Sequence, residues 1–108
     1  MDDRIKLSIL IDLYGVLLTD KQRDIMNLYY NDDLSLAEIG EITNTSRQAV
    51  FDIIKRCDKL LLEYEEKLCL LKNEIESKLF KENLLEMLEL VDNNDKIEKI
   101  KKYILENI

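Results

Sequence analysis

Apolar residues recur along this chain at intervals of three and four, the spacing of one face of an α-helix. Asp2 or Asp3 can cap a first helix, and Gly15 can end it in the manner of a left-handed C-cap. The apolar positions predicted to face inward on this helix are Ile5, Ile9, Leu10 and Leu13. The pattern therefore predicts that the chain opens with an amphipathic helix of about three turns.

A second helix is predicted to begin at Thr19. Gln22 stands three residues later, which is the spacing of a capping box. Its predicted inner face comprises Ile25, Met26, Leu28 and Tyr29. The run Asn31-Asp32-Asp33 is rich in turn-forming residues and is expected to end this helix.

The stretch from Ser35 to Arg56 predicts two helices joined by a tight turn. Ser35 and Glu38 have the spacing of a second capping box, so the first of these helices should run from Leu36 to about Thr43. Its inward positions are predicted to be Leu36, Ile39 and Ile42. Gly40 costs a helix interior about 1 kcal/mol relative to alanine. We expect such a residue where a second helix approaches its backbone closely.

The turn itself has its own local signals. Asn44 is one of the few residue types other than glycine that enters the left-handed conformation at modest cost. Ser46 is a good N-cap for the following helix. The inward positions of that helix are predicted to be Val50, Ile53, Ile54 and Cys57. Together these features predict a helix-turn-helix.

The helix that begins at Arg47 is predicted to be long, because one face stays apolar for about 25 residues, or roughly 40 Å. Two further helices are predicted over about 74–91 and about 95–106, separated by Asp92-Asn93-Asn94-Asp95. The boundary near Lys72-Asn73 is weak, which leaves open whether the long helix continues through it. We predict a helix-turn-helix domain over residues 1–71 and a C-terminal helical extension over residues 72–108.

The long apolar stripe fits two interpretations. It can form ordinary core within one chain, or part of it can pair with a second copy through the C-terminal helices. A homodimer of this kind would set two recognition helices at a fixed spacing. Leucine-rich helices flanked by charged residues fit both.

Composition favours an all-α protein and excludes several other classes. The 108 residues are 46% hydrophobic and 36% charged, with no proline and two glycines. Cys57 and Cys69, without any histidine, fit small hydrophobic residues better than a redox pair or a zinc site. We expect no metal and no cofactor. The longest uncharged apolar run, Leu13 to Thr19, is too short to span a membrane, and we expect a soluble, cytoplasmic protein.

The net charge of −7 limits how this chain can bind nucleic acid. The acid excess is largest in residues 63–108, which contain eight basic and twelve acidic side chains. Between Ser46 and Lys59 the balance is reversed, with four basic residues against two acidic ones. Such a local basic edge can contact one phosphate backbone, so we expect a modest and salt-sensitive affinity.

Five residues of the second helix of the motif are candidate nucleic-acid contacts: Arg47, Gln48, Phe51, Lys55 and Lys59. In the first turn, arginine can bond guanine and glutamine can bond adenine in a bidentate manner. The phenyl ring is suited to a thymine methyl group, and the lysines are suited to phosphates. The alternative is a solvated face on which Phe51 packs against Tyr29 or Tyr30. Asp52 counts against docking in the major groove because it repels phosphate.

The sequence offers little for catalysis. It contains no histidine, no serine or cysteine in a nucleophile motif, and no glycine-rich phosphate loop. Acidic residues are placed mainly at solvent-facing helical positions. We therefore predict that the chain is not an enzyme.

Three segments resemble known bacterial proteins. They are Leu-Thr-x-x-Gln-Arg at 18–23, Leu-Ser-x-x-Glu-Ile-Gly at 34–40 and Ser-Arg-Gln-Ala-Val at 46–50. This pattern resembles the DNA-binding region 4 of sigma factors and is more similar still to the YlxM family of small helix-turn-helix proteins. The resemblance covers roughly Leu7 to Leu71 and implies association with the signal recognition particle pathway. Two roles remain open: a nucleic-acid-binding regulator, and an adaptor that binds the particle's protein or RNA without specific DNA binding.

Overall fold

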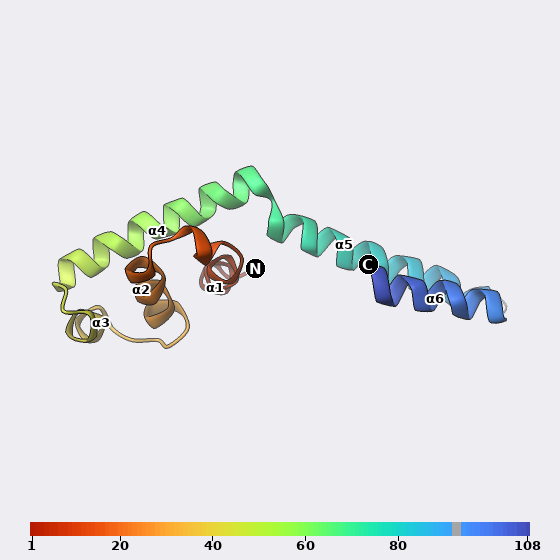
Figure 1. Ribbon diagram of the computed structural model, residues 1–108, viewed down its shortest axis with the longest axis horizontal. Coiled ribbons are helices and arrows are strands. Elements are labelled where there is room, and N and C mark those ends of the chain that lie inside the picture. Colours follow the sequence, from red (N-terminus) through yellow and green to blue (C-terminus); the bar gives the residue numbers. More distant parts are fainter. Residues whose placement is uncertain (92–93) are drawn as a thin grey trace. The chain divides into compact units, whose positions relative to one another are not determined.

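The computed structural model describes residues 1–91 and 94–108, and all regular structure within these residues is helical (Figure 1). The elements are α1 (Asp3–Tyr14), the short 3₁₀ helix η1 (Gly15–Leu17), α2 (Asp20–Tyr30), α3 (Leu36–Thr43), α4 (Arg47–Leu68), α5 (Leu70–Glu89) and α6 (Asp95–Asn107). The predicted all-α fold is confirmed. The chain divides into two compact units, Met1–Leu71 and Lys72–Ile108.

In the first unit, α4 lies along α1, α2 and α3 and contacts all three (Figure 1). Its stripe of small and medium apolar side chains supplies one side of the core, because a 3.6-residue period keeps positions three and four apart on one face. The residues of this core with no exposed surface are Leu10, Ile25, Met26, Ile39, Val50, Cys57 and Leu61. The predicted inward positions of α2 and α4 are therefore largely confirmed.

The predicted face and end of the first helix were partly wrong. Ile5 is 57% exposed, whereas Tyr14, which the periodicity did not select, is 1% exposed. The buried face comprises Leu7, Leu10, Ile11 and Tyr14. Gly15 has φ −57°, so it is not a left-handed cap; the chain continues into η1 instead. The turn of η1 places Leu18 in the core without a left-handed residue at Gly15.

Both predicted capping boxes are confirmed. The Gln22 N–H donates to Thr19 Oγ1 at 3.2 Å, and the Thr19 N–H donates to Gln22 Oε1 at 3.0 Å. Ser35 and Glu38 exchange the equivalent bonds at 3.1 Å each. The bond from the Ser35 N–H to the carboxylate, followed by the Ser35 side chain, lowers the pKa of Glu38, since both favour its charged form. Helix α3 has the predicted bounds.

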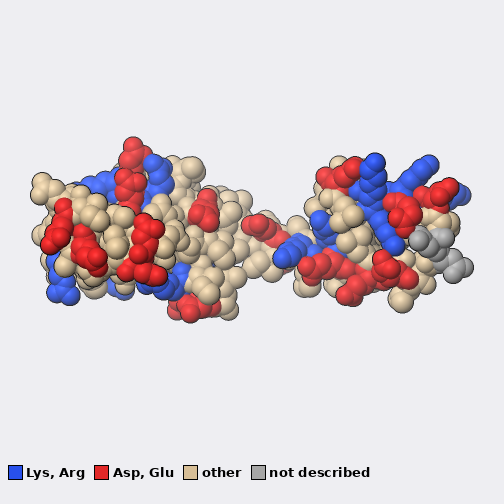
Figure 2. Space-filling view, turned by 90° about the horizontal axis from the view of Figure 1, so that it is seen from below, with Lys and Arg blue, Asp and Glu red and all other residues tan. Residues whose placement is uncertain are grey.

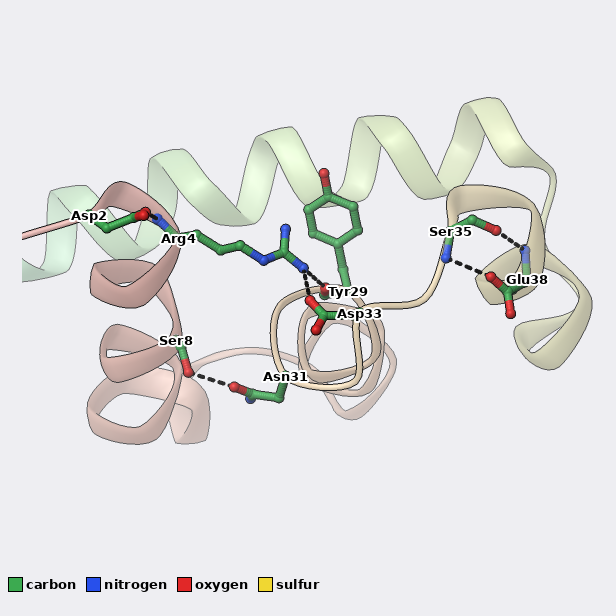
Figure 3. A network of polar contacts seen from close by, with 8 residues as sticks. All are labelled: Asp2, Arg4, Ser8, Tyr29, Asn31, Asp33, Ser35 and Glu38. Carbon is green, nitrogen blue, oxygen red and sulfur yellow. Dashed lines mark hydrogen bonds and ion pairs between the residues drawn. The ribbon is translucent and has the colours of Figure 1, made fainter.

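A polar network attaches the start of α1 to the link that precedes α3 (Figure 3). The Arg4 guanidinium donates to the Tyr29 carbonyl and to the Asp33 carboxylate, the latter at 2.7 Å. It also lies 5.0 Å from the centroid of the Tyr29 ring. Ser8 donates to the side-chain oxygen of Asn31. The network fixes the end of α2, and so the entry of the chain into the helix-turn-helix.

The long helix is shorter than predicted. Helix α4 has 22 residues and ends at Leu68, because Cys69 adopts a left-handed conformation with φ 56°. The chain then runs as helix straight through the weak boundary predicted at Lys72-Asn73. Tyr14 explains the position of the break: its hydroxyl donates to Glu65 Oε1 at 2.7 Å and accepts the Leu70 N–H at 3.1 Å.

Glu65 completes this arrangement, because the same Oε1 atom accepts the Leu71 N–H at 3.0 Å. The first two N–H groups of α5 are therefore satisfied by side chains, as at an N-cap. Of the predicted break at residues 92–95, Asp92 and Asn93 lie outside the described residues. Asn94 caps α6 by accepting the N–H groups of Lys96 and Ile97. Among the described residues, no helix combines the length and the apolar character needed to cross a bilayer.

A hydrogen bond between a tyrosine and a carboxylate joins α2 to α4, and it predicts that the free energy of unfolding falls at alkaline pH. The Tyr30 hydroxyl donates to Asp58 Oδ1 at 2.7 Å. Burial, followed by this bond, raises the pKa of Tyr30 above the ordinary value of 10. The folded chain therefore keeps a proton that the unfolded chain releases, so the stability is full below about pH 10 and falls as the pH rises further.

We expect the free energy of unfolding to decline above about pH 10. The Tyr30 proton contributes less than about 1.4 kcal/mol per pH unit to this decline, because the ring is partly exposed. Urea denaturation across a pH series measures this. Tyr30→Phe should make the decline shallower without abolishing it, because burial also raises the pKa of Tyr14. Tyr103→Phe, at a residue that is 67% exposed, should leave the decline unchanged. Equal slopes in the wild type and Tyr30→Phe would contradict the prediction.

Candidate nucleic-acid interface

The turn between α3 and α4 is built from local hydrogen bonds. Asn44 has φ 52°, as predicted for a left-handed residue, and the Gly40 carbonyl accepts the Thr45 N–H at 2.9 Å. Thr43 donates its hydroxyl proton to the Ile39 carbonyl at 2.7 Å. Ser46 Oγ accepts the Ala49 N–H at 3.1 Å and caps α4. The predicted helix-turn-helix is confirmed.

The sequence predicted that a second helix approaches the backbone at Gly40, but the structure places a different group there. A Cβ atom placed there would lie 2.5 Å from the Thr45 carbonyl oxygen and 3.7 Å from the Arg47 nitrogen. The close neighbour is therefore the backbone of the turn, followed by the first residue of α4, rather than the body of a second helix. This contact sets the angle at which α4 leaves the turn.

The five predicted contact residues form a single exposed ridge over residues 47–59 of α4. Arg47, Gln48, Phe51, Lys55 and Lys59 are all exposed. The structure brings the first three together with Leu36 of α3 around an open groove of about 450 Å³. Lys55 joins them, because its ammonium group lies 5.6 Å from the centroid of the Phe51 ring. Lys59 lies one helical turn beyond.

Two features of this ridge were missed from the sequence. Leu36 packs against the core as predicted, but it is only partly buried and also lines the groove, which was not predicted. Gln48 Nε2 donates to Asp52 Oδ1 at 3.0 Å. Their separation of four residues is the signal that could have predicted this pair. The bond uses one of the two N–H groups of the Gln48 amide, which has a second N–H and Oε1 for bonding a base.

Phe51 is 42% exposed, so its ring remains available to a ligand. The two tyrosines considered as its partners pack edge to face on each other, with ring centroids 4.9 Å apart. Phe51 lines the groove, with the Lys55 ammonium group over its ring. An aromatic ring flanked by cations can stack on or contact a nucleobase.

A larger groove lies between α2 and the end of α3, where the sequence predicted no site. Its volume is about 650 Å³, and it is lined by Lys21, Asp24, Asn27, Leu28, Ile42 and Thr43. Ile42, predicted to point inward, is 63% exposed, because Ile39 and Gly40 occupy the buried face of α3. One cation and one anion give this groove no preference for phosphate.

Acidic residues outnumber basic ones in the chain as a whole, 23 to 16. Figure 2 shows acidic and basic groups mixed on the displayed faces of both units. The first turn of α4 has no acidic residue. Because the N-terminal end of a helix favours anions, the backbone of this turn can lie close to a phosphate.

The fold, the turn and the exposed second helix define a helix-turn-helix protein. The chain belongs to the UPF0122 family, whose model matches residues 1–104 and is described as "Putative helix-turn-helix protein, YlxM / p13 like". The predicted membership of the YlxM family is thereby confirmed.

Clostridial relatives cover nearly the whole chain. A UPF0122 protein of Clostridium kluyveri is 54% identical over 114 residues and covers 100% of both chains. One from Clostridium perfringens is 55% identical over 108 residues, covering 100% of this chain and 95% of its own. One from Clostridium acetobutylicum is 47% identical over 104 residues, covering 93% of this chain and 90% of its own.

Proposed function

We propose that this chain is a small regulatory protein that binds nucleic acid through the exposed ridge on α4. The observation that supports this most is the gathering of Arg47, Gln48 and Phe51 around one open groove at the start of an exposed helix. Arginine and glutamine in the first turn can read base edges, and the phenyl ring can contact a thymine methyl group. Lys55 and Lys59 follow along the same ridge and bind phosphates.

The affinity is modest and depends strongly on salt. The net charge of −7 repels a polyanion at a distance, so binding rests on short-range contacts along the ridge. Each phosphate that a lysine neutralises releases counterions, and the logarithm of the affinity then falls linearly with the logarithm of the salt concentration.

The biological setting that we propose is the signal recognition particle pathway, in the cytoplasm and without catalysis. This rests on the resemblance to YlxM proteins. A second candidate is an adaptor that binds the particle's protein or RNA and has no specific DNA target. The acid excess of residues 63–108 favours it, because an acidic surface suits a basic protein partner.

A pull-down from native lysate at two salt concentrations separates the two candidates. Recovery of double-stranded DNA that is lost steeply as salt rises supports the regulator. Recovery of the particle's protein or its small RNA that persists at the higher salt supports the adaptor.

Arg47→Ala combined with Lys55→Ala should weaken binding of the recovered nucleic acid by about 10- to 100-fold. The first change removes a base contact, and the second removes a phosphate contact, so the salt dependence should also become shallower. Fluorescence anisotropy over a salt series measures both effects. Lys67→Ala combined with Lys102→Ala is the matched control, because it removes the same charge from exposed positions away from the ridge. An unchanged affinity in the ridge variant would show that another surface binds.

A further inference from the structure

The C-terminal unit is a hairpin that buries very little of itself. Within this unit, α5 and α6 lie antiparallel (Figure 1), and Lys101 of α6 pairs with Glu89 of α5 at 3.0 Å. Among the described residues of Lys72–Ile108, Ile104 is the only buried one, at 4% exposure. A unit of this size that buries so little apolar surface needs further packing to be stable.

The two sides of the hairpin differ in chemistry. Lys101 pairs with Glu89 and, at 3.8 Å, with Glu98, so these residues mark one charged side. At 100° per residue, Phe80 and Met87 lie roughly opposite Glu89 around α5. By the same geometry Ile100 and Tyr103 lie roughly opposite Glu98 around α6. Because the helices are antiparallel, both sets project from the side of the hairpin away from the ion pairs.

This second side forms an exposed apolar face, which we define by Phe80, Leu84, Met87, Ile100 and Tyr103. Phe80 is 60% exposed, Met87 63% and Tyr103 67%; Ile100 is 46% exposed and Leu84 is partly buried. Large apolar side chains clustered on one face in this way mark an interaction surface rather than scattered surface residues.

We propose that the apolar face binds the same face of a second copy of this chain. The charges of the two helices favour this partner. Over residues 73–89, α5 contains five glutamates and two lysines, whereas α6 contains four lysines and three acidic residues. When α5 of one copy packs on α6 of the other, an acid-rich helix lies beside a lysine-rich one, and the two-fold symmetry repeats this pairing.

The product is a symmetric four-helix bundle made of two hairpins. Each hairpin then gains the apolar contacts that its own two helices cannot provide. The proposal is independent of nucleic-acid binding, since none of the five residues of the face belongs to α4. It also assigns part of the C-terminal apolar stripe to an intermolecular role.

Sedimentation velocity of the full chain without nucleic acid tests this proposal. The wild type should sediment as a dimer. Phe80→Gln with Met87→Gln should raise the dissociation constant at least about 100-fold, and Ile100→Gln with Tyr103→Gln should do the same from α6. Leu90→Gln with Leu105→Gln is the matched control, because these residues are 88% and 59% exposed but lie outside the face. This control should remain a dimer.

Circular dichroism provides the accompanying measure of helix content, which should change little because the substituted side chains are exposed or only partly buried. A wild-type chain that sediments as anything other than a dimer overturns the proposal. So does a dimer that survives either pair of substitutions in the face, or a control that dissociates as readily as the two variants.

Discussion

Replacing Gly40 by alanine is expected to lower the free energy of unfolding by about 2–4 kcal/mol. The added methyl group would lie 2.5 Å from the Thr45 carbonyl oxygen. This oxygen belongs to the backbone of the turn and cannot rotate aside as a flexible side chain would. The turn must therefore open to admit the methyl group.

Opening the turn has further costs. The Thr45 N–H bond to the Gly40 carbonyl, 2.9 Å long, would lengthen or break. Alanine in place of glycine gains helix propensity of about 1 kcal/mol, which offsets only part of this loss. Because the same contact sets the exit angle of α4, the Ala variant should also bind nucleic acid more weakly than its stability alone implies.

Gly15→Ala is the matched control, since it adds the same methyl group at the other glycine. There the nearest atom is Cδ of the Arg23 side chain at 3.4 Å, which can move, and φ is −57°. We expect this variant to be neutral or to gain up to about 1 kcal/mol through the unfolded state. Urea denaturation measures both variants. A Gly40→Ala chain as stable as Gly15→Ala would show that the turn tolerates the methyl group.

Local interactions explain which parts of the fold could be predicted from the sequence. The two capping boxes, the left-handed Asn44 and the Ser46 cap each involve residues no more than four positions apart. Short-range patterns therefore predict these features without reference to any tertiary contact. The exposed ridge on α4 was predictable for the same reason, because its members recur at helical spacing.

The features that the sequence did not predict depend on distant partners. Helix α4 ends at Leu68 where Tyr14, from the first helix, reaches across to the Leu70 N–H. The apolar periodicity of α1 predicted Leu13 rather than Tyr14 as an inward residue. The face of α1 that α4 covers is rotated from the most apolar face of that helix. Leu36 reaches the groove only because the turn sets α3 beside the start of α4. No local pattern encodes such arrangements.

Replacing Tyr14 by alanine is expected to destabilise the chain by about 3–5 kcal/mol, the range for removing a buried aromatic side chain. Tyr14 is 1% exposed and contacts the Tyr64 ring, with centroids 6.0 Å apart. Tyr14→Phe keeps most of this packing but removes the hydroxyl that the Leu70 N–H and Glu65 share. We expect it to cost about 0.5–1.5 kcal/mol, because the part-buried bonds to the Leu70 N–H and to Glu65 are lost.

The two variants separate packing from the hydrogen bonds that define the start of α5. In Tyr14→Phe, amide hydrogen exchange should accelerate at Leu70 and Leu71 more than at Leu61, in the middle of α4, since only the junction loses its bonds. In Tyr14→Ala, exchange should accelerate throughout the core of the first unit. If Tyr14→Phe leaves exchange at Leu70 unchanged, then Cys69 ends α4 through its own backbone conformation, and the tyrosine hydroxyl follows the break rather than fixing it.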